Sequence, residues 1–173
     1  MTERQHLTWT QKEAFRDRMG LSERGGEIFA VAVIALVGSF FYAHQAWSTG
    51  FFTTSFGPTE AFFLYGSIIA GGAGPVSRFI TGRRNVSRIP ELGASALWIA
   101  GSIWLLAVLP FNFAHLPDVL PDSLKFLLSR ITNDVAWVLF VLGILGGIGS
   151  VPVNVVLYRR VRRLLFPDKY DLR

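Results

Sequence analysis

Two histidines and a few carboxylates are the side chains in this sequence best suited to bind a metal ion. His44, Glu60, His115 and Asp118 are the candidates, and each lies at or near the end of a long apolar segment. Imidazole and carboxylate groups bind divalent cations when several of them converge on one point. Their spacing matches no local ligand pattern, such as two histidines four residues apart on one helix. The sequence leaves a metal site open and implies no cofactor.

Catalytic chemistry has no recognisable motif in this chain. Serine, histidine and aspartate all occur, but catalysis is recognised by geometry rather than by composition. The chain has no cysteine, so thiol chemistry, disulfides and thiolate metal sites are excluded. We therefore expect a protein that is not an enzyme.

The stretch GGAGPVSRF, residues 71–79, is rich in glycine but does not fit a phosphate-binding loop. Such a loop needs a lysine and a hydroxyl directly after its last glycine, and it follows a strand. Small residues at helical spacing instead predict that two membrane spans, about 61–80 and 135–158, cross closely, within the chain or between copies. The expected packing residues are Gly66, Ala70, Gly71, Gly74, Gly143, Gly147 and Ser150.

Two prolines follow the glycine clusters, Pro75 in the first case and Pro152 in the second. Proline lacks a backbone N–H and either kinks or ends a helix. The pair could form a hinge, but we expect each proline to end its helix.

Parts of the chain resemble the small four-helix fluoride channels. The glycines and Arg78 in 71–79 are similar to their glycine-rich helix end, and GFFTTSFGPTEAFF, residues 50–63, is similar to their phenylalanine–threonine–serine string. That string follows the glycine helix by two spans in those channels, whereas here it precedes it. We therefore transfer no residue roles from them.

The elements that carry these residues are long apolar segments. Asp, Glu, Lys and Arg are absent from 28–59, 61–77, 92–117 and 135–158, and the mean hydropathy of the chain is +0.40. Apolar runs of about 18 residues or more are typical of membrane-spanning helices. We predict an all-α membrane protein, a four-transmembrane-helix bundle forming a single integral membrane domain over 1–173. The spans are about 28–47, 61–80, 93–113 and 135–158, with a short amphipathic surface helix between the third and the fourth.

The basic residues predict how the chain is oriented. Of the 17 Lys and Arg residues, 15 lie in 1–27, at the end of the second span or in the connection after it, or after 158. Cytoplasmic segments are enriched in these residues. We expect a multi-pass cell-membrane protein with both termini cytoplasmic, including an N-terminal segment 1–27 and a basic tail 159–173. The residues expected at anionic lipid headgroups are Arg78, Arg159, Arg160, Arg162 and Arg163.

Three functions are compatible with these features. The first is an accessory, assembly or scaffold subunit that acts through helix packing, with other membrane chains or with itself as partner. The second is a small oligomeric channel or transporter, and the third is an outer-face metal-binding protein or membrane enzyme. The absence of charge near the middle of each span argues against a proton-coupled pump. The net charge of +5 is explained by membrane orientation, so we expect no nucleic-acid partner.

Overall fold

The structure is a computed structural model that describes residues 7–167, and this part of the chain is helical, as the sequence predicts. Two isolated bridges, Arg18 to Arg83 and Phe52 to Phe111, are its only strand-like pairings. The α-helices are α1 (Trp9–Phe15), α2 (Leu21–Ala46), α3 (Pro58–Gly71), α4 (Ala73–Thr81), α5 (Arg84–Val108) and α6 (Asn133–Leu165). Two 3₁₀ helices, η2 (Phe113–Val119) and η3 (Asp122–Leu127), lie between α5 and α6.

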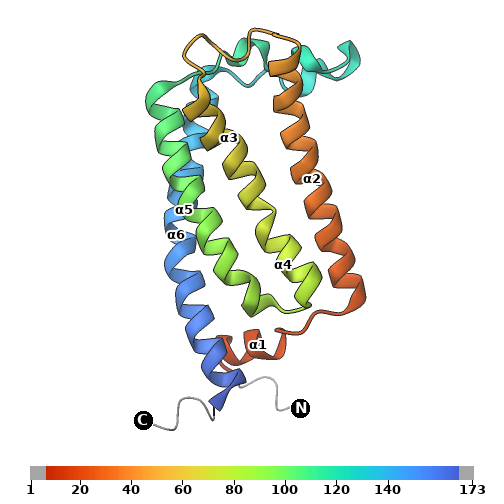
Figure 1. The fold of residues 1–173 in the computed structure, drawn as a ribbon, viewed down its shortest axis with the longest axis vertical. Coiled ribbons are helices and arrows are strands. Elements are labelled where there is room, and N and C mark those ends of the chain that lie inside the picture. Colours follow the sequence, from red (N-terminus) through yellow and green to blue (C-terminus); the bar gives the residue numbers. More distant parts are fainter. Residues whose placement is uncertain (1–6, 168–173) are drawn as a thin grey trace.

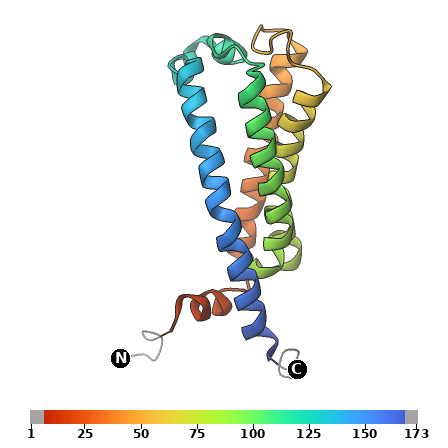
Figure 2. The ribbon, with the colours of Figure 1, turned by 90° about the vertical axis from the view of Figure 1, so that its left-hand side faces the viewer.

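The long helices run up and down beside one another, and α1 lies across one end of them (Figure 1). We call this end the α1 end, and the opposite end, with η2 and η3, the η end. The view at right angles shows the same arrangement, with α1 beneath the bundle near the last turns of α6 (Figure 2). Both ends of the described chain therefore lie at the α1 end.

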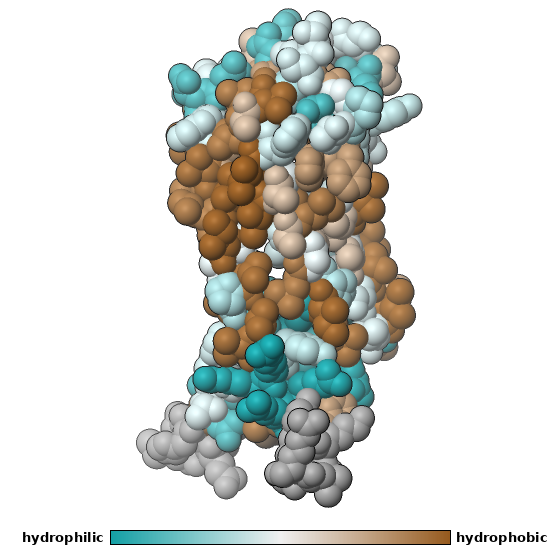
Figure 3. Space-filling view, turned by 60° about the vertical axis from the view of Figure 1, so that its left-hand side comes forward, coloured by the Kyte–Doolittle hydropathy of each residue, from teal (hydrophilic) through white to brown (hydrophobic). Residues whose placement is uncertain are grey.

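Three helices, α2, α5 and α6, are long and apolar enough to cross a membrane. The expected second span is divided into α3 and α4, neither of which has that length alone, so the structure contains three such helices in its described part rather than four. Hydrophobic side chains cover the middle of the face seen in Figure 3, and hydrophilic ones gather at its two ends. This distribution fits a protein that crosses a membrane.

The division at Gly72 follows from the local sequence. Pro75 has no backbone N–H, so the carbonyl of Gly71 loses its usual helical donor four residues on. The N–H of Gly72 bonds to the Ile69 carbonyl at 3.0 Å, three residues back, which tightens the last turn of α3. Gly72 keeps helical angles, with φ −74° and ψ −18°, so α4 continues from α3.

The expectation that each proline ends its helix is wrong, since Pro75 lies inside α4, which continues to Thr81, and Pro152 does not end its helix either. Pro152 lies inside α6, which continues to Leu165. Leu157 and Val161, in the turns after the proline, are buried at 4% and 2% exposure. Their packing stabilises the helix beyond the proline.

The connection between α5 and α6 contains two 3₁₀ helices rather than a single α-helix. Pro117 lies inside η2 and Pro121 directly precedes η3. Two residues without an N–H, four positions apart, interrupt an α-helical hydrogen-bond ladder. Below them lies the main buried core of the η end, formed by Phe51, Leu64, Leu105, Phe111 and Leu116.

Candidate functional site

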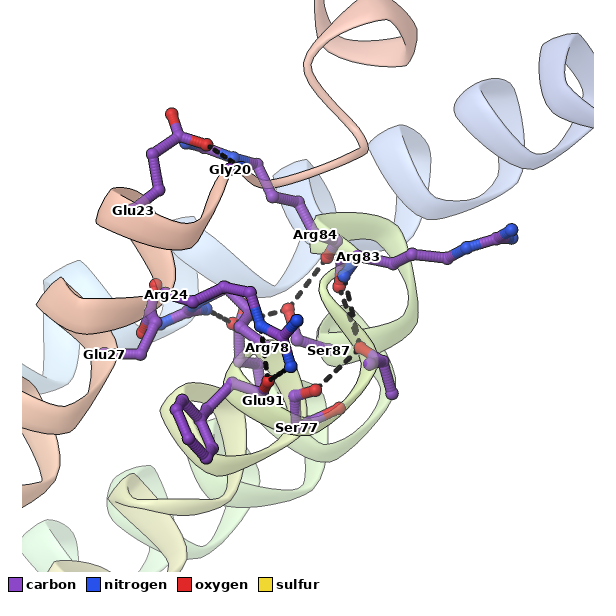
Figure 4. A network of polar contacts seen from close by, with 12 residues as sticks. Gly20, Glu23, Arg24, Glu27, Ser77, Arg78, Arg83, Arg84, Ser87 and Glu91 are labelled. Carbon is purple, nitrogen blue, oxygen red and sulfur yellow. Dashed lines mark hydrogen bonds and ion pairs between the residues drawn. The ribbon is translucent and has the colours of Figure 1, made fainter.

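A cluster of charged side chains at the α1 end joins α2, α4 and α5. Arg78 of α4 donates from Nε to Glu27 Oε1 of α2 at 2.7 Å, and from Nη1 to Glu91 Oε1 of α5. All three side chains are a quarter exposed or less. Figure 4 shows Arg78 between the two carboxylates, so one guanidinium group holds three helices together.

Glu91 is the centre of this cluster. It also accepts a hydrogen bond from Ser87 Oγ at 3.1 Å. Its side chain passes over Gly74, where an added Cβ would lie 2.6 Å from Glu91 Cγ and 2.8 Å from Oε1. Gly74 therefore makes room for a carboxylate of the neighbouring helix.

Asp17, just after α1, provides the cap for the start of α5. Its carbonyl accepts from the Arg84 N–H at 2.9 Å, and its Oδ1 accepts from the Asn85 N–H at 2.8 Å. The first N–H groups of a helix have no partner within it, so these bonds satisfy two of them. The segment after α1 thereby fixes where α5 begins, nine residues before the expected start of the span at 93.

Arg88 of α5 forms an ion pair with α1 and a hydrogen bond with α6. Arg88 donates to Glu13 Oε2 and to Asn154 Oδ1, each at 3.0 Å. Its side chain is 12% exposed, so these bonds are shielded from solvent. A third pair, Arg84 with Glu23 at 3.0 Å, is about half exposed and contributes less.

The cluster surrounds a cavity of about 320 Å³ whose charges balance. Three carboxylates and three guanidinium groups line it, with one serine: Glu13, Glu27, Glu91, Arg78, Arg84, Arg88 and Ser87. Each of the three carboxylates is paired with one of these arginines. The pairs join side chains of α1, α2, α4 and α5.

An open hollow of about 380 Å³ adjoins the cluster between α3, α5 and α6. Most of its lining side chains are small, and Glu91 lines both this hollow and the charged cavity. The lining residues are Ser67, Gly71, Glu91, Ala94, Ser95, Trp98, Gly146, Gly147, Ser150 and Asn154.

Three glycines, Gly66 of α3 and Gly143 and Gly147 of α6, face α5. An added Cβ on Gly66 would contact Leu97 at 3.6 Å, and one on Gly147 would lie 2.9 Å from Ile99 Cγ1. Gly143 similarly approaches Trp98. Within the described chain α5 lies between the two glycine faces, so the expected direct crossing of the second and fourth spans inside one molecule is not found. Two further expected packing residues lie on α3 and α6. Ala70 is half-buried on α3, and Ser150 Oγ donates to the Gly147 carbonyl at 2.8 Å.

The metal-binding candidates at the η end are used for internal contacts. His44 is buried, with Nδ1 2.6 Å from Thr49 Oγ1 and Nε2 3.2 Å from the Leu116 carbonyl oxygen. Glu60 accepts from Trp104 Nε1 at 2.9 Å and from the Gly57 N–H at 2.8 Å.

The remaining candidates form a pair of their own, His115 Nδ1 with Asp118 Oδ2 at 2.8 Å. Nearby, the Lys125 ammonium donates to Asp122 and holds the pKa of that carboxyl below its ordinary value. Across residues 7–167 no three histidine, aspartate or glutamate side chains gather in a way that could hold a metal ion. The four candidates are therefore not brought together.

The arginines expected at lipid headgroups divide into two groups. Arg78 is paired within the charged cluster, whereas Arg159, Arg160, Arg162 and Arg163 are exposed on the last turns of α6.

Sequence reasoning missed Glu27 and Glu91, the partners of Arg78. The available signal was their position, since each directly precedes a charge-free window, at 28–59 and 92–117.

No family model, curated protein or solved structure matches this chain. Its function is therefore inferred from its own geometry.

Proposed function

We propose that this chain is a four-pass protein of the cell membrane, with the α1 end in the cytoplasm. In this proposal α3, Gly72 and α4 form the second pass, since 58–81 would rise about 35 Å at about 1.5 Å per residue. The support is the alternating direction of the helices (Figure 1) and the basic residues at the α1 end. Both termini are then cytoplasmic.

We further propose that it is a non-catalytic accessory, assembly or scaffold subunit that acts through helix packing. The observation that carries this proposal is the open hollow between α3, α5 and α6 with its small side chains. Small residues let the backbone of another helix come close, which stabilises helix association in lipid. The neighbouring carboxylates are already paired within the chain, so they hold the walls of the hollow in place.

Gly146 offers a direct test of this function. It lines the hollow, and an added Cβ there meets nothing within 4 Å, so we expect Gly146→Leu to occupy the hollow with little effect on the fold. Gly149 on the same helix is equally unobstructed but does not line the hollow, so Gly149→Leu is the matched control.

The experiment compares unlike chains that co-purify with tagged wild type and variants from the native membrane. We expect Gly146→Leu to lose them and Gly149→Leu to keep them. Equal recovery with both variants would contradict binding at the hollow.

An oligomeric channel is the alternative, favoured by one observation: Glu91 joins the charged cavity to the small-residue hollow. Several copies could complete a polar path through this junction. A homo-oligomer that passes ions in liposomes would select this function.

A further inference from the structure

A separate hollow of about 290 Å³ lies between α1 and the last turns of α6. It is lined by Thr8, Thr10, Gln11, Arg160, Arg163 and Leu164. Arg160, Arg163 and Leu164 are three and four positions apart, so they share one face of α6. The hollow is distinct from the charged cavity, with which it shares no lining residue.

The packing of α1 against α6 positions this hollow. Leu157 and Val161 are the buried residues of the final turns of α6. Glu13 holds α1 to Arg88 of α5, which in turn bonds to Asn154 of α6. The two walls of the hollow are therefore fixed relative to each other.

The polar groups of the hollow suit an anion. Among residues 7–167 no carboxylate lines it, and the nearby Glu13 is paired with Arg88. Gln11 Oε1 accepts from the Thr8 N–H at 2.9 Å and the Thr8 hydroxyl at 3.0 Å, which leaves the amide NH₂ of Gln11 as a donor. Two guanidinium groups and this amide can all donate to phosphate oxygens.

We propose that this hollow binds the phosphate group of an anionic membrane lipid. The reason is its depth: Tyr158 closes the charge-free window 135–158, and the hollow begins two residues later on the same helix. Headgroup phosphates lie just beyond the hydrocarbon layer. Trp9, which is 59% exposed on α1, is of the residue type enriched at this interface. This inference depends on the proposed membrane orientation, but not on the accessory role.

The same helix supplies a matched control. Arg162 is exposed like Arg160 and Arg163, but it donates to the Tyr158 hydroxyl at 2.7 Å and does not line the hollow. Arg159 is also outside the lining. The pairs R160Q/R163Q and R159Q/R162Q therefore remove equal charge from α6, and only the first pair alters the hollow.

The test is native mass spectrometry of the whole chain in a neutral detergent, titrated with phosphatidylglycerol or phosphatidylcholine. We expect wild type and R159Q/R162Q to bind one phosphatidylglycerol preferentially. R160Q/R163Q should bind it about thirtyfold more weakly, because two charged donors are lost, each worth about 1 kcal/mol. Unchanged melting temperatures of both pairs would show that they remain folded.

Two results would overturn the proposal. Equal weakening in both pairs would mean diffuse attraction of lipid to a basic helix end. Displacement of the lipid by inorganic phosphate would assign the hollow to a soluble anion instead. Labelling of single cysteines with an impermeant maleimide tests the membrane orientation independently of lipid binding.

Discussion

Gly74 of α4 and Glu91 of α5 lie so close that an added Cβ on residue 74 would come within 2.6 Å of Glu91 Cγ. The same glutamate accepts hydrogen bonds from Arg78 and Ser87. The glycine therefore permits a charged contact between helices, in addition to their close approach.

Gly74→Ala should destabilise the protein by about 1–3 kcal/mol, because the new methyl group displaces the Glu91 side chain from a packed site. Gly71 is the control, since an added Cβ there meets nothing within 4 Å. Thermal unfolding in mild detergent measures both variants. A melting temperature of Gly74→Ala equal to that of Gly71→Ala would refute the close contact.

Arg78→Gln should lower the free energy of unfolding by about 1–3 kcal/mol, because it leaves Glu27 and Glu91 without their shared guanidinium group. This range is below that of a fully buried pair, since the Arg78 side chain is 23% exposed. Arg83 extends away from the cluster in Figure 4, so Arg83→Gln should change stability little. Similar losses in both variants would argue against a specific role for Arg78.

Asp17→Ala should loosen α1, because it removes the Oδ1 that accepts from the Asn85 N–H and keeps only the main-chain carbonyl that accepts from the Arg84 N–H. Losing a buried acceptor costs about 1–3 kcal/mol. Trypsin should then cleave faster after the exposed Arg16 and Arg18, as followed by mass spectrometry. Glu23→Gln removes only a half-exposed pair and should leave the rate near wild type. Unchanged cleavage in Asp17→Ala would show that α1 is held by other contacts.

His44→Ala should be costly, at about 2–4 kcal/mol, because it empties a buried site between Phe40 and Phe51 and leaves the Leu116 carbonyl without its donor. His115→Ala should cost about 1 kcal/mol or less, since its pair with Asp118 is more than a third exposed. Melting temperatures compare the two. If zinc stabilised wild type and did not stabilise His115→Ala, that result would indicate a metal site at the η end.

Labelling of single cysteines should report the membrane orientation without background, because the chain has no cysteine. A membrane-impermeant maleimide added to intact cells should label Ser123→Cys in η3. It should label Ser22→Cys and Thr81→Cys only after lysis; all three positions are exposed. Labelling of Thr81→Cys from outside would mean that α3 and α4 do not cross the membrane.

The long helices could be predicted from the sequence because a run of apolar residues in lipid must satisfy its backbone within a helix. Three of the charge-free windows fall on α2, α5 and α6. The remaining window, 61–77, falls on the pair α3 and α4. The ends of the helices were less predictable. The start of α5 lies among charged residues, for which the sequence predicts a loop. In the structure these residues are helical, and Asp17, 67 positions before Arg84, caps the helix.

The charged cluster could not be predicted because its partners are distant in the chain. Glu27 and Arg78 are 51 positions apart, and no local spacing relates them. Small residues indicated helix packing, but the expected pairing of the second span with the fourth differs from the structure, in which α3 and α6 each pack against α5. This packing depends on larger side chains of α5, such as Trp98 and Ile99, which fill the space beside Gly143 and Gly147.

The most direct measurement of the proposed accessory role is the mass of the native particle, extracted gently from its own membrane together with its lipids. We predict a particle that contains this chain with at least one chain of different sequence, bound at the hollow between α3, α5 and α6. A particle made only of this chain, and able to pass ions when reconstituted, would contradict that role and select the channel.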